Sequence, residues 1–318
     1  MENWTEVTEF ILVGLTGVRW LQILLFFLLL LIYLLTLTGN IIIITITLLD
    51  RRLHTPMYFL LRTFSLVEMC FTSVIILKAL FNLASGTNSV SMAACFAQCF
   101  AYVIVGTVEF FLLAAMSFDR YIAICKPLHY ATIMNSRFCS QLVLGSWVIS
   151  FMYVIVPLIM LFQLPFCSPN VIDHFFCDIV VVLKVACRDT QLLGLLVFLF
   201  STGSILSTFA ITIISYINII FTVLHIPSTS GRKKAFSVCI SHLTVVSITY
   251  GSCIFMYVKP AEGSKVDLGK TVALLNGVVS PFLNPFIYSL RNKQVKEALR
   301  DAVLRTVMFS NMPKCFGR

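Results

Sequence analysis

Residues 22–48 read QILLFFLLLLIYLLTLTGNIIIITITL, and this stretch contains no charged side chain. A soluble domain has no place to bury such a block, whereas a bilayer accepts about 20 consecutive apolar residues as one spanning helix. The composition agrees, because 59% of the 318 residues are hydrophobic and 12% are charged, with a mean hydropathy of +0.95. Soluble proteins are about 25% charged. The chain is therefore predicted to be a membrane protein.

Apolar blocks of this length recur along the chain, at 22–48, 57–80, 93–118, 140–162, 195–224, 235–258 and 269–290. Lipid offers no hydrogen bonds, so a spanning backbone must form helices or a closed barrel. Runs such as Leu24–Leu31 and Ile41–Ile44 lack the alternation of a barrel strand. The sequence shows no internal repeat or long linker. We expect an all-α membrane protein, a single seven-transmembrane-helix bundle that fills residues 1–318.

The distribution of charge predicts the orientation. With the N-terminal segment 1–21 outside the cell, 16 of the 23 Lys and Arg residues lie on the cytoplasmic side, as the positive-inside rule requires. The tail 291–318 is then cytoplasmic, and the sequon at Asn3 is a glycosylation site on the outer side. The stretch Met1–Glu9 is acidic, unlike a cleavable signal peptide, so we expect Met1–Gln22 to remain in the mature chain. The net charge of +9 then describes a face near anionic lipid, not nucleic-acid binding.

Four of the 11 cysteines are predicted on the outer side, namely Cys95, Cys167, Cys177 and Cys187. An oxidising compartment favours two disulfides among them, and spacing alone leaves three pairings open. The alternative is a metal site that uses His174 beside Cys177.

Enzyme motifs are absent from the sequence, which contains no HExxH, GxSxG, phosphate-binding loop or CxxC. We therefore expect neither catalysis nor a cofactor. The main competing class is an ion-coupled secondary transporter that uses Glu68 and Glu109, but transporters show internal repeats and paired interrupted helices. A channel would need a polar-lined helix or a filter-like loop. The sequence shows neither the transporter features nor the channel features.

Four polar residues, Asn40, Glu68, Glu109 and Asn284, fall in the middle of predicted helices. Such residues are costly at membrane depth and mark functional sites by default. If the helices pack as a bundle, these four converge on one polar pocket. Two carboxylates in a low dielectric share a proton or hold a cation such as Na⁺. A hydrogen-bonded structural network with one protonated acid is the alternative.

The triplet Asp119-Arg120-Tyr121 ends the third predicted helix at its cytoplasmic boundary. Arg120 can pair with Asp119 or release it and face a partner, which makes a two-position switch.

Two prolines, Pro281 and Pro285, interrupt the seventh predicted helix, and the Asn284 side chain can satisfy freed carbonyl groups. The segment Arg291–Val307 follows. It places apolar residues at helical spacing, so we expect a short amphipathic helix along the inner leaflet.

Several motifs occur in order along nearly the whole chain: Gly39-Asn40, LHTPMYFL at Leu53–Leu60, MSFDRYIAICKPLHY at Met116–Tyr130, Ser215-Tyr216, KAFSVCISHL at Lys234–Leu243, and PFLNPFIYSLRN at Pro281–Asn292. On these motifs the sequence resembles the rhodopsin-like G-protein-coupled receptors and, within them, the olfactory (odorant) receptors. The resemblance implies a receptor in the plasma membrane that couples to a stimulatory G protein of the olfactory type and raises cyclic AMP. It implies disulfides Cys95–Cys177 and Cys167–Cys187.

The resemblance also assigns roles to residues of the bundle. It places Tyr250 low in the ligand cavity, and it implies an activation switch formed by Asp119, Arg120, Tyr216, His242, Asn284 and Tyr288.

Three departures from the family pattern stand out. Glu68 replaces the more usual Asp and keeps the charge. Arg62 replaces a small polar residue, a change that bears on basal activity. Thr249 replaces a Phe, a change that bears on the shape of the cavity floor.

Helical phase and family position predict the lining of a ligand cavity in the outer half of the bundle: Tyr102, Val103, Gly106, Thr107, Phe200, Ser204, Tyr250, Cys253, Ile254, Tyr257 and Gly277. This set is mostly apolar with a few hydroxyl groups and one thiol. We expect no carboxylate in this upper region, because Glu109 lies about two turns below Tyr102. The predicted ligand is a small, neutral, weakly polar volatile molecule and not a biogenic amine. Its binding would drive the 235–258 helix outward and expose Arg120 to the G protein.

Overall fold

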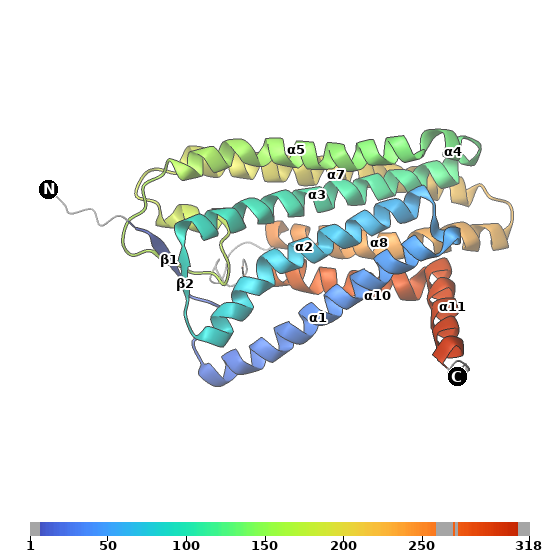
Figure 1. Ribbon diagram of the computed structural model, residues 1–318. Helices are drawn as coiled ribbons and strands as arrows, with labels where there is room; N and C mark the ends of the chain where they lie inside the picture. The colour runs from blue at the N-terminus through green and yellow to red at the C-terminus, as the bar shows by residue number, and fades with distance from the viewer. Residues whose placement is uncertain (1–6, 259–269, 271–272, 311–318) are drawn as a thin grey trace.

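Long helices run side by side along one axis in the computed structural model, which describes residues 7–258, 270 and 273–310 (Figure 1). The longest are α1 (Arg19–Leu49), α2 (Pro56–Ser85), α3 (Met92–Cys125), α5 (Ser136–Phe162), α7 (Gln191–Leu224) and α8 (Thr229–Val258). A further traverse consists of the π-helix η4 (Leu275–Val279) followed directly by α10 (Ser280–Arg291). The amphipathic segment forms α11 (Lys293–Ser310), which lies across the end of the bundle.

Short elements connect the long ones: β1 (Glu9–Leu12), η1 (Arg51–Leu53), β2 (Ser89–Ser91), η2 (Pro127–His129), α4 (Tyr130–Ile133), β3 (Val171–Ile172), α6 (Ile179–Val182) and η3 (Leu183–Val185). The strands form one sheet in the order β2-β1-β3. In it β1 pairs antiparallel with β2 and parallel with β3. The N-terminal segment thereby joins the α2–α3 connection to the α5–α7 connection.

Local capping signals define the ends of the helices. Helix α2 has Pro56 in its first turn and ends at Gly86, whose φ of 72° is a left-handed conformation that suits glycine. The hydroxyl of Ser91 caps α3, and the side-chain oxygen of Asn135 caps α5 by accepting from the Phe138 amide at 2.9 Å. Helix α3 continues to Cys125, past the predicted limit of 118. The prediction was short because apolar content marks the part of a helix inside the membrane and not the end of the helix.

Five of the described helices, α1, α2, α3, α5 and α7, are long and apolar enough to cross a membrane by length and composition. Helices α2 and α3 are buried over more than half of their most apolar windows, whereas α1, α5 and α7 turn most of theirs outward. The outward faces carry large apolar side chains such as Trp20, Phe27 and Leu144. A surface of this kind requires lipid around it.

Helix α3 lies at the centre, in contact with α2, α5, α7 and α8. Two glycines allow other helices to approach closely. A Cβ at Gly39 would lie 2.8 Å from Pro285, and one at Gly277 would lie 2.1 Å from Ile75. The seventh traverse therefore packs tightly against α1 and α2 at these points. Pro281 lies in the first turn of α10, just after the wider π turn, and Pro285 lies inside α10.

Two disulfides, Cys95–Cys177 and Cys167–Cys187, secure the connection between α5 and α7. These are the pairs that the family resemblance implied, and the pairing excludes Cys177 as a free thiolate ligand for a metal. Cys99, which the sequence argument did not place, is a buried free thiol on α3. We refer below to the disulfide end of the bundle, where Cys95 and Cys177 lie, and to the opposite Arg120 end.

Candidate functional site

A cavity of about 470 Å³ lies at the disulfide end, between α3, α7, the seventh traverse and residues 171–185 of the α5–α7 connection. Five of the predicted residues line it: Tyr102, Val103, Gly106, Thr107 and Ser204. They occupy one face of α3 and the facing turn of α7, as helical periodicity requires. Thr249, which departs from the family pattern, also lines the cavity.

The other predicted ligand residues lie elsewhere or outside the description. Phe200 stacks on Tyr153 with 5.6 Å between ring centroids and lines a small adjacent cavity. Tyr250 packs between Phe110 and Phe209, with ring centroids 5.4 and 5.1 Å away, and so lies behind the cavity wall that Phe110 forms. Gly277 packs against α2 and is not part of the lining. The side chains of Cys253, Ile254 and Tyr257 lie outside the described part of the chain.

The expectation that the upper region contains no carboxylate is wrong. Glu109, Asp173 and Asp178 all line the cavity, together with Lys184. Glu109 reaches it because the cavity extends about two helical turns down α3 below Tyr102. The charged residues between 173 and 184 come from the connection, where no periodicity indicates which side chains point inward. The Cys95–Cys177 pairing was the available signal, since it draws the neighbours of Cys177 over α3.

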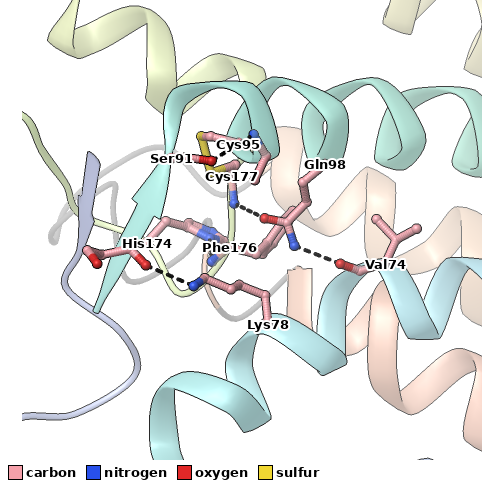
Figure 2. The surroundings of a disulfide bond; sticks show 10 residues. Val74, Lys78, Ser91, Cys95, Gln98, His174, Phe176 and Cys177 are labelled. Carbon is pink, nitrogen blue, oxygen red and sulfur yellow. Dashed lines mark hydrogen bonds between the residues drawn. A yellow bond between two sulfur atoms is a disulfide. The ribbon is translucent and has the colours of Figure 1, made fainter. Parts of the chain in front are cut away.

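Gln98 on α3 holds this connection in place. Its side-chain amide donates to the Val74 carbonyl of α2 at 2.7 Å and accepts from the Cys177 amide at 2.9 Å (Figure 2). Nearby, the Lys78 ammonium donates to the Ser89 carbonyl at 2.8 Å. The Cys95–Cys177 disulfide and Gln98 therefore anchor the roof of the cavity to α3, and Gln98 links it onward to α2.

His174 is a buried part of that roof. Its ring stacks on Phe175 at 4.8 Å, and its Nδ1 accepts a long hydrogen bond from the Phe176 amide at 3.4 Å. Burial, and next the positive charge of Lys270, lower the pKa of His174 to about 4. Lys270 itself pairs with Asp173 at 2.8 Å. His174 is thus neutral near pH 7, and its neighbouring charges are partly compensated.

Asp178 caps the short helix α6, where its carboxylate accepts from the Val180 amide at 3.2 Å. Burial raises the pKa of this carboxyl above its usual value.

Deeper in the bundle, the predicted polar residues only partly converge. Asn284 donates to the Glu68 carboxylate at 2.5 Å, and Glu68 interacts electrostatically with Glu109. Asn40 is buried but donates to the Thr36 carbonyl of its own helix at 3.0 Å. Among the described residues, one oxygen of Glu68 and the carbonyl oxygen of Asn284 have no hydrogen-bond partner. The arrangement leaves acceptor atoms for a proton or a cation.

At the Arg120 end, three of the predicted switch residues meet. Arg120, His242 and Tyr288 line a small cavity of about 20 Å³. Arg120 forms a buried ion pair with Asp119. The Asp119 carboxylate also accepts from the Tyr130 hydroxyl at 2.8 Å. Tyr130 had no predicted role, although it ends the MSFDRYIAICKPLHY motif.

A second contact at this end joins α7 to α8. The Tyr216 hydroxyl and the His242 Nδ1 are 2.6 Å apart, and both side chains are buried. The arrangement is a closed one, in which Arg120 is paired and α8 is hydrogen-bonded to α7. A change to a second state would have to break one or both of these contacts.

Comparisons with known proteins agree with this architecture. The family model described as olfactory receptor matches residues 29–306. Olfactory receptor 6E1 of Mus musculus is 54% identical, over 98% of this chain and 99% of the mouse protein. Olfactory receptor 6C74 of Homo sapiens is 53% identical, over 98% and 99% of the two chains. The crystal structure of squid rhodopsin superposes with a TM-score of 0.73 over 91% of this chain and 82% of that one, at 16% identity, which supports the fold.

These matches identify the chain as a signalling receptor rather than an enzyme, and they favour a receptor over the transporter alternative. The protein belongs to the olfactory receptor family of G-protein-coupled receptors.

Proposed function

We propose that this receptor binds a small, neutral, weakly polar volatile ligand in the cavity at the disulfide end. The family implies an odorant ligand, a G-protein partner and a multi-pass place in the plasma membrane. The cavity is the observation that carries the finer proposal. Its volume of about 470 Å³ is within the range of about 300–1,000 Å³ typical of small-molecule sites.

The chemistry of the lining supports a weakly polar ligand. Above Glu109, the wall that α3 and α7 form is apolar apart from hydroxyl groups such as those of Thr107 and Ser204. The charged side chains lie at the roof, where Lys270 compensates Asp173 and Lys184 lies near Asp178. Glu109 at the deep end can accept a hydrogen bond from a ligand hydroxyl. A neutral molecule with one donor group fits this distribution.

The N-terminus and the disulfide end face the cell exterior in this proposal, and the Arg120 end faces the cytoplasm. The excess of basic residues at the Arg120 end supports this orientation. A ligand shifts the receptor toward its active state only if it binds that state more tightly. We infer that the shift moves α8 away from α7 and frees Arg120 for a stimulatory G protein of the olfactory type, which raises cyclic AMP.

A cyclic-AMP assay tests this function. Cells that contain the olfactory G protein would express the receptor and receive a panel of small volatiles, with Arg120→Ala as the signalling-deficient variant. We expect a response in the wild type that disappears in Arg120→Ala at equal surface expression. A ligand response that persists in the variant would contradict the proposed switch.

The same panel tests the ligand class, because it would contain matched alcohols, ketones and amines of equal carbon number. Activation by amines alone would contradict the neutral ligand and leave the receptor assignment in place.

A further inference from the structure

Arg62 lies in the second turn of α2, and it forms no ion pair with an acidic side chain of the described residues. The four ion pairs among the described residues involve Arg52, Arg120 and Lys270, not Arg62. Its guanidinium lies over the ring of Phe59, 5.5 Å from the centroid, and the side chain is half-buried. A cation near membrane depth is costly unless an anion or polar groups surround it. An anion from outside the described chain would compensate this charge.

Arg62 lines a groove of about 640 Å³ at the Arg120 end, between the α1–α2 connection and the start of α5. One part of the groove is polar, with Thr55, Ser136 and Ser140 in the lining. Thr55 precedes α2, and its side chain does not cap the helix. Another part is apolar and includes Leu48 and Phe59. The groove is thus amphipathic, and its cation lies over the Phe59 ring of the apolar part.

The position of the groove identifies the class of its occupant. Leu48, Leu49 and Leu66 on the adjoining helices are 51%, 78% and 52% exposed, so the groove opens onto the apolar outer surface of the bundle. Lipid covers that surface. The Arg62 backbone lies about 9 Å along the helix axis from the start of α2. A long side chain of this kind can extend back toward the level of the lipid headgroups. A guanidinium binds phosphate in a planar, bidentate geometry.

The surrounding charge favours an anionic lipid. Arg51 and Arg137 are exposed beside the two sides of the groove, and the residues that line it include no carboxylate. The C-terminal residues 311–318 are a poor alternative occupant, because Lys314 and Arg318 are also basic. We propose that this groove binds the headgroup phosphate of an anionic phospholipid from the leaflet around the Arg120 end, with Arg62 as its main anchor.

The site would lie next to the switch. Tyr130 lines the groove, and its hydroxyl holds the Asp119 carboxylate that pairs with Arg120. A lipid in the groove would therefore lie next to Tyr130, which is linked through Asp119 to Arg120. With the orientation proposed above, this leaflet is the cytoplasmic one.

Photo-crosslinking of the full-length receptor in nanodiscs tests the site. The discs would contain phosphatidylcholine and phosphatidylserine at a ratio of about 7:3, with a trace of photoactivatable phosphatidylserine, an arrangement that keeps the receptor in anionic lipid as at the inner leaflet. Peptide mass spectrometry would locate the label. We expect it on the peptides around Arg62 and Ser136. Arg62→Ser should reduce it about fivefold to tenfold, the effect of one charged contact to phosphate.

Two further variants make the test decisive. Arg232→Ser at the start of α8 removes the same charge at the same end of the bundle but outside the groove, and it should leave the label unchanged. Ser140→Trp fills the groove from the α5 side without altering Arg62, and it should reduce the label as strongly as Arg62→Ser. Circular dichroism and size-exclusion chromatography would show that each variant is folded.

Other results would overturn the proposal. Equal losses in Arg62→Ser and Arg232→Ser would indicate general surface attraction instead of a site. Full labelling in Ser140→Trp would place the lipid elsewhere. A photoactivatable phosphatidylcholine probe should label the groove more weakly, and equal labelling would refute the preference for an anionic headgroup.

Discussion

The two ends of the bundle are built in different ways. The disulfide end contains a cavity of about 470 Å³ under a roof of irregular chain, whereas the inner cavity between the switch residues Arg120, His242 and Tyr288 measures about 20 Å³. A large, mostly apolar cavity suits the exchange of varied small ligands. Close contacts such as Tyr216–His242 suit two discrete arrangements, because packed interfaces change state rather than deform continuously. Recognition and switching therefore require opposite kinds of packing.

The largest effect should follow from opening the roof of the cavity. Cys177→Ser removes the bond to Cys95, and loss of a native disulfide typically costs about 2–5 kcal/mol. We expect surface expression and the cyclic-AMP response to be lost together. Cys70→Ser, which changes an exposed free thiol on α2, is the control and should behave as the wild type. Normal surface levels in Cys177→Ser would show that the roof does not depend on this bond.

A change in cavity volume should alter ligand potency without affecting the Arg120 end. A Cβ at Gly106 would lie 3.1 Å from the Phe71 ring and project at the cavity wall, so Gly106→Ala should shift the half-maximal ligand concentration by about tenfold, or about 1.4 kcal/mol. Gly203→Ala on the exposed side of α7 meets no atom within 4 Å and is the matched control. Equal dose–response curves for both variants would argue against ligand binding at this wall.

A break in the contact between α7 and α8 should raise activity without ligand. Tyr216→Phe removes the hydrogen bond to His242, which is worth about 1 kcal/mol, so basal cyclic AMP should rise by up to about fivefold. His242→Phe should have a similar effect, and the double variant should add little to either one, because both remove the same contact. Additive increases would show that the two residues act separately.

The smallest effect should be a pH dependence of the roof. The pKa of His174 is about 4 in the folded receptor, below its ordinary value of about 6.5, so the unfolded chain binds more protons between these values. Stability should therefore fall as the pH decreases from about 6.5 towards 4, by about 1 kcal/mol at pH 5.5. Protonation of Asp178, whose pKa is raised, opposes this loss at the acidic end of the range.

Thermal unfolding of purified receptor at pH 7.5 and pH 5.5 measures this effect. His174→Phe keeps an aromatic ring against Phe175 but cannot take up a proton, so its melting temperature should change less with pH than that of the wild type. Lys270 and Asp173 are present in both proteins and cancel in the comparison. An identical pH response in the variant would assign the loss of stability to another group.

Some parts of the site could be predicted because they depend on periodicity or on short motifs. Tyr102, Val103, Gly106 and Thr107 follow from the turn of one helix, and the structure places all four along the cavity. Arg120 and Asp119 are adjacent in the chain, so their ion pair was an expected state. By contrast, the absence of acids near the ligand was a wrong prediction, since Asp173 and Asp178 belong to a connection without a repeating pattern.

The sequence by itself determined that this chain is a bundle of membrane helices, because apolar blocks such as residues 22–48 have only one way to satisfy their backbone in lipid. It also determined the family, through motifs that are contiguous in the chain. Only the tertiary structure decided that residues 171–185 roof the cavity, that Glu109 reaches it, and that Arg62 has no acidic partner within the described chain. These features depend on contacts between segments far apart in the chain. Neither the composition nor the helical periodicity of the sequence specifies which of those segments come into contact.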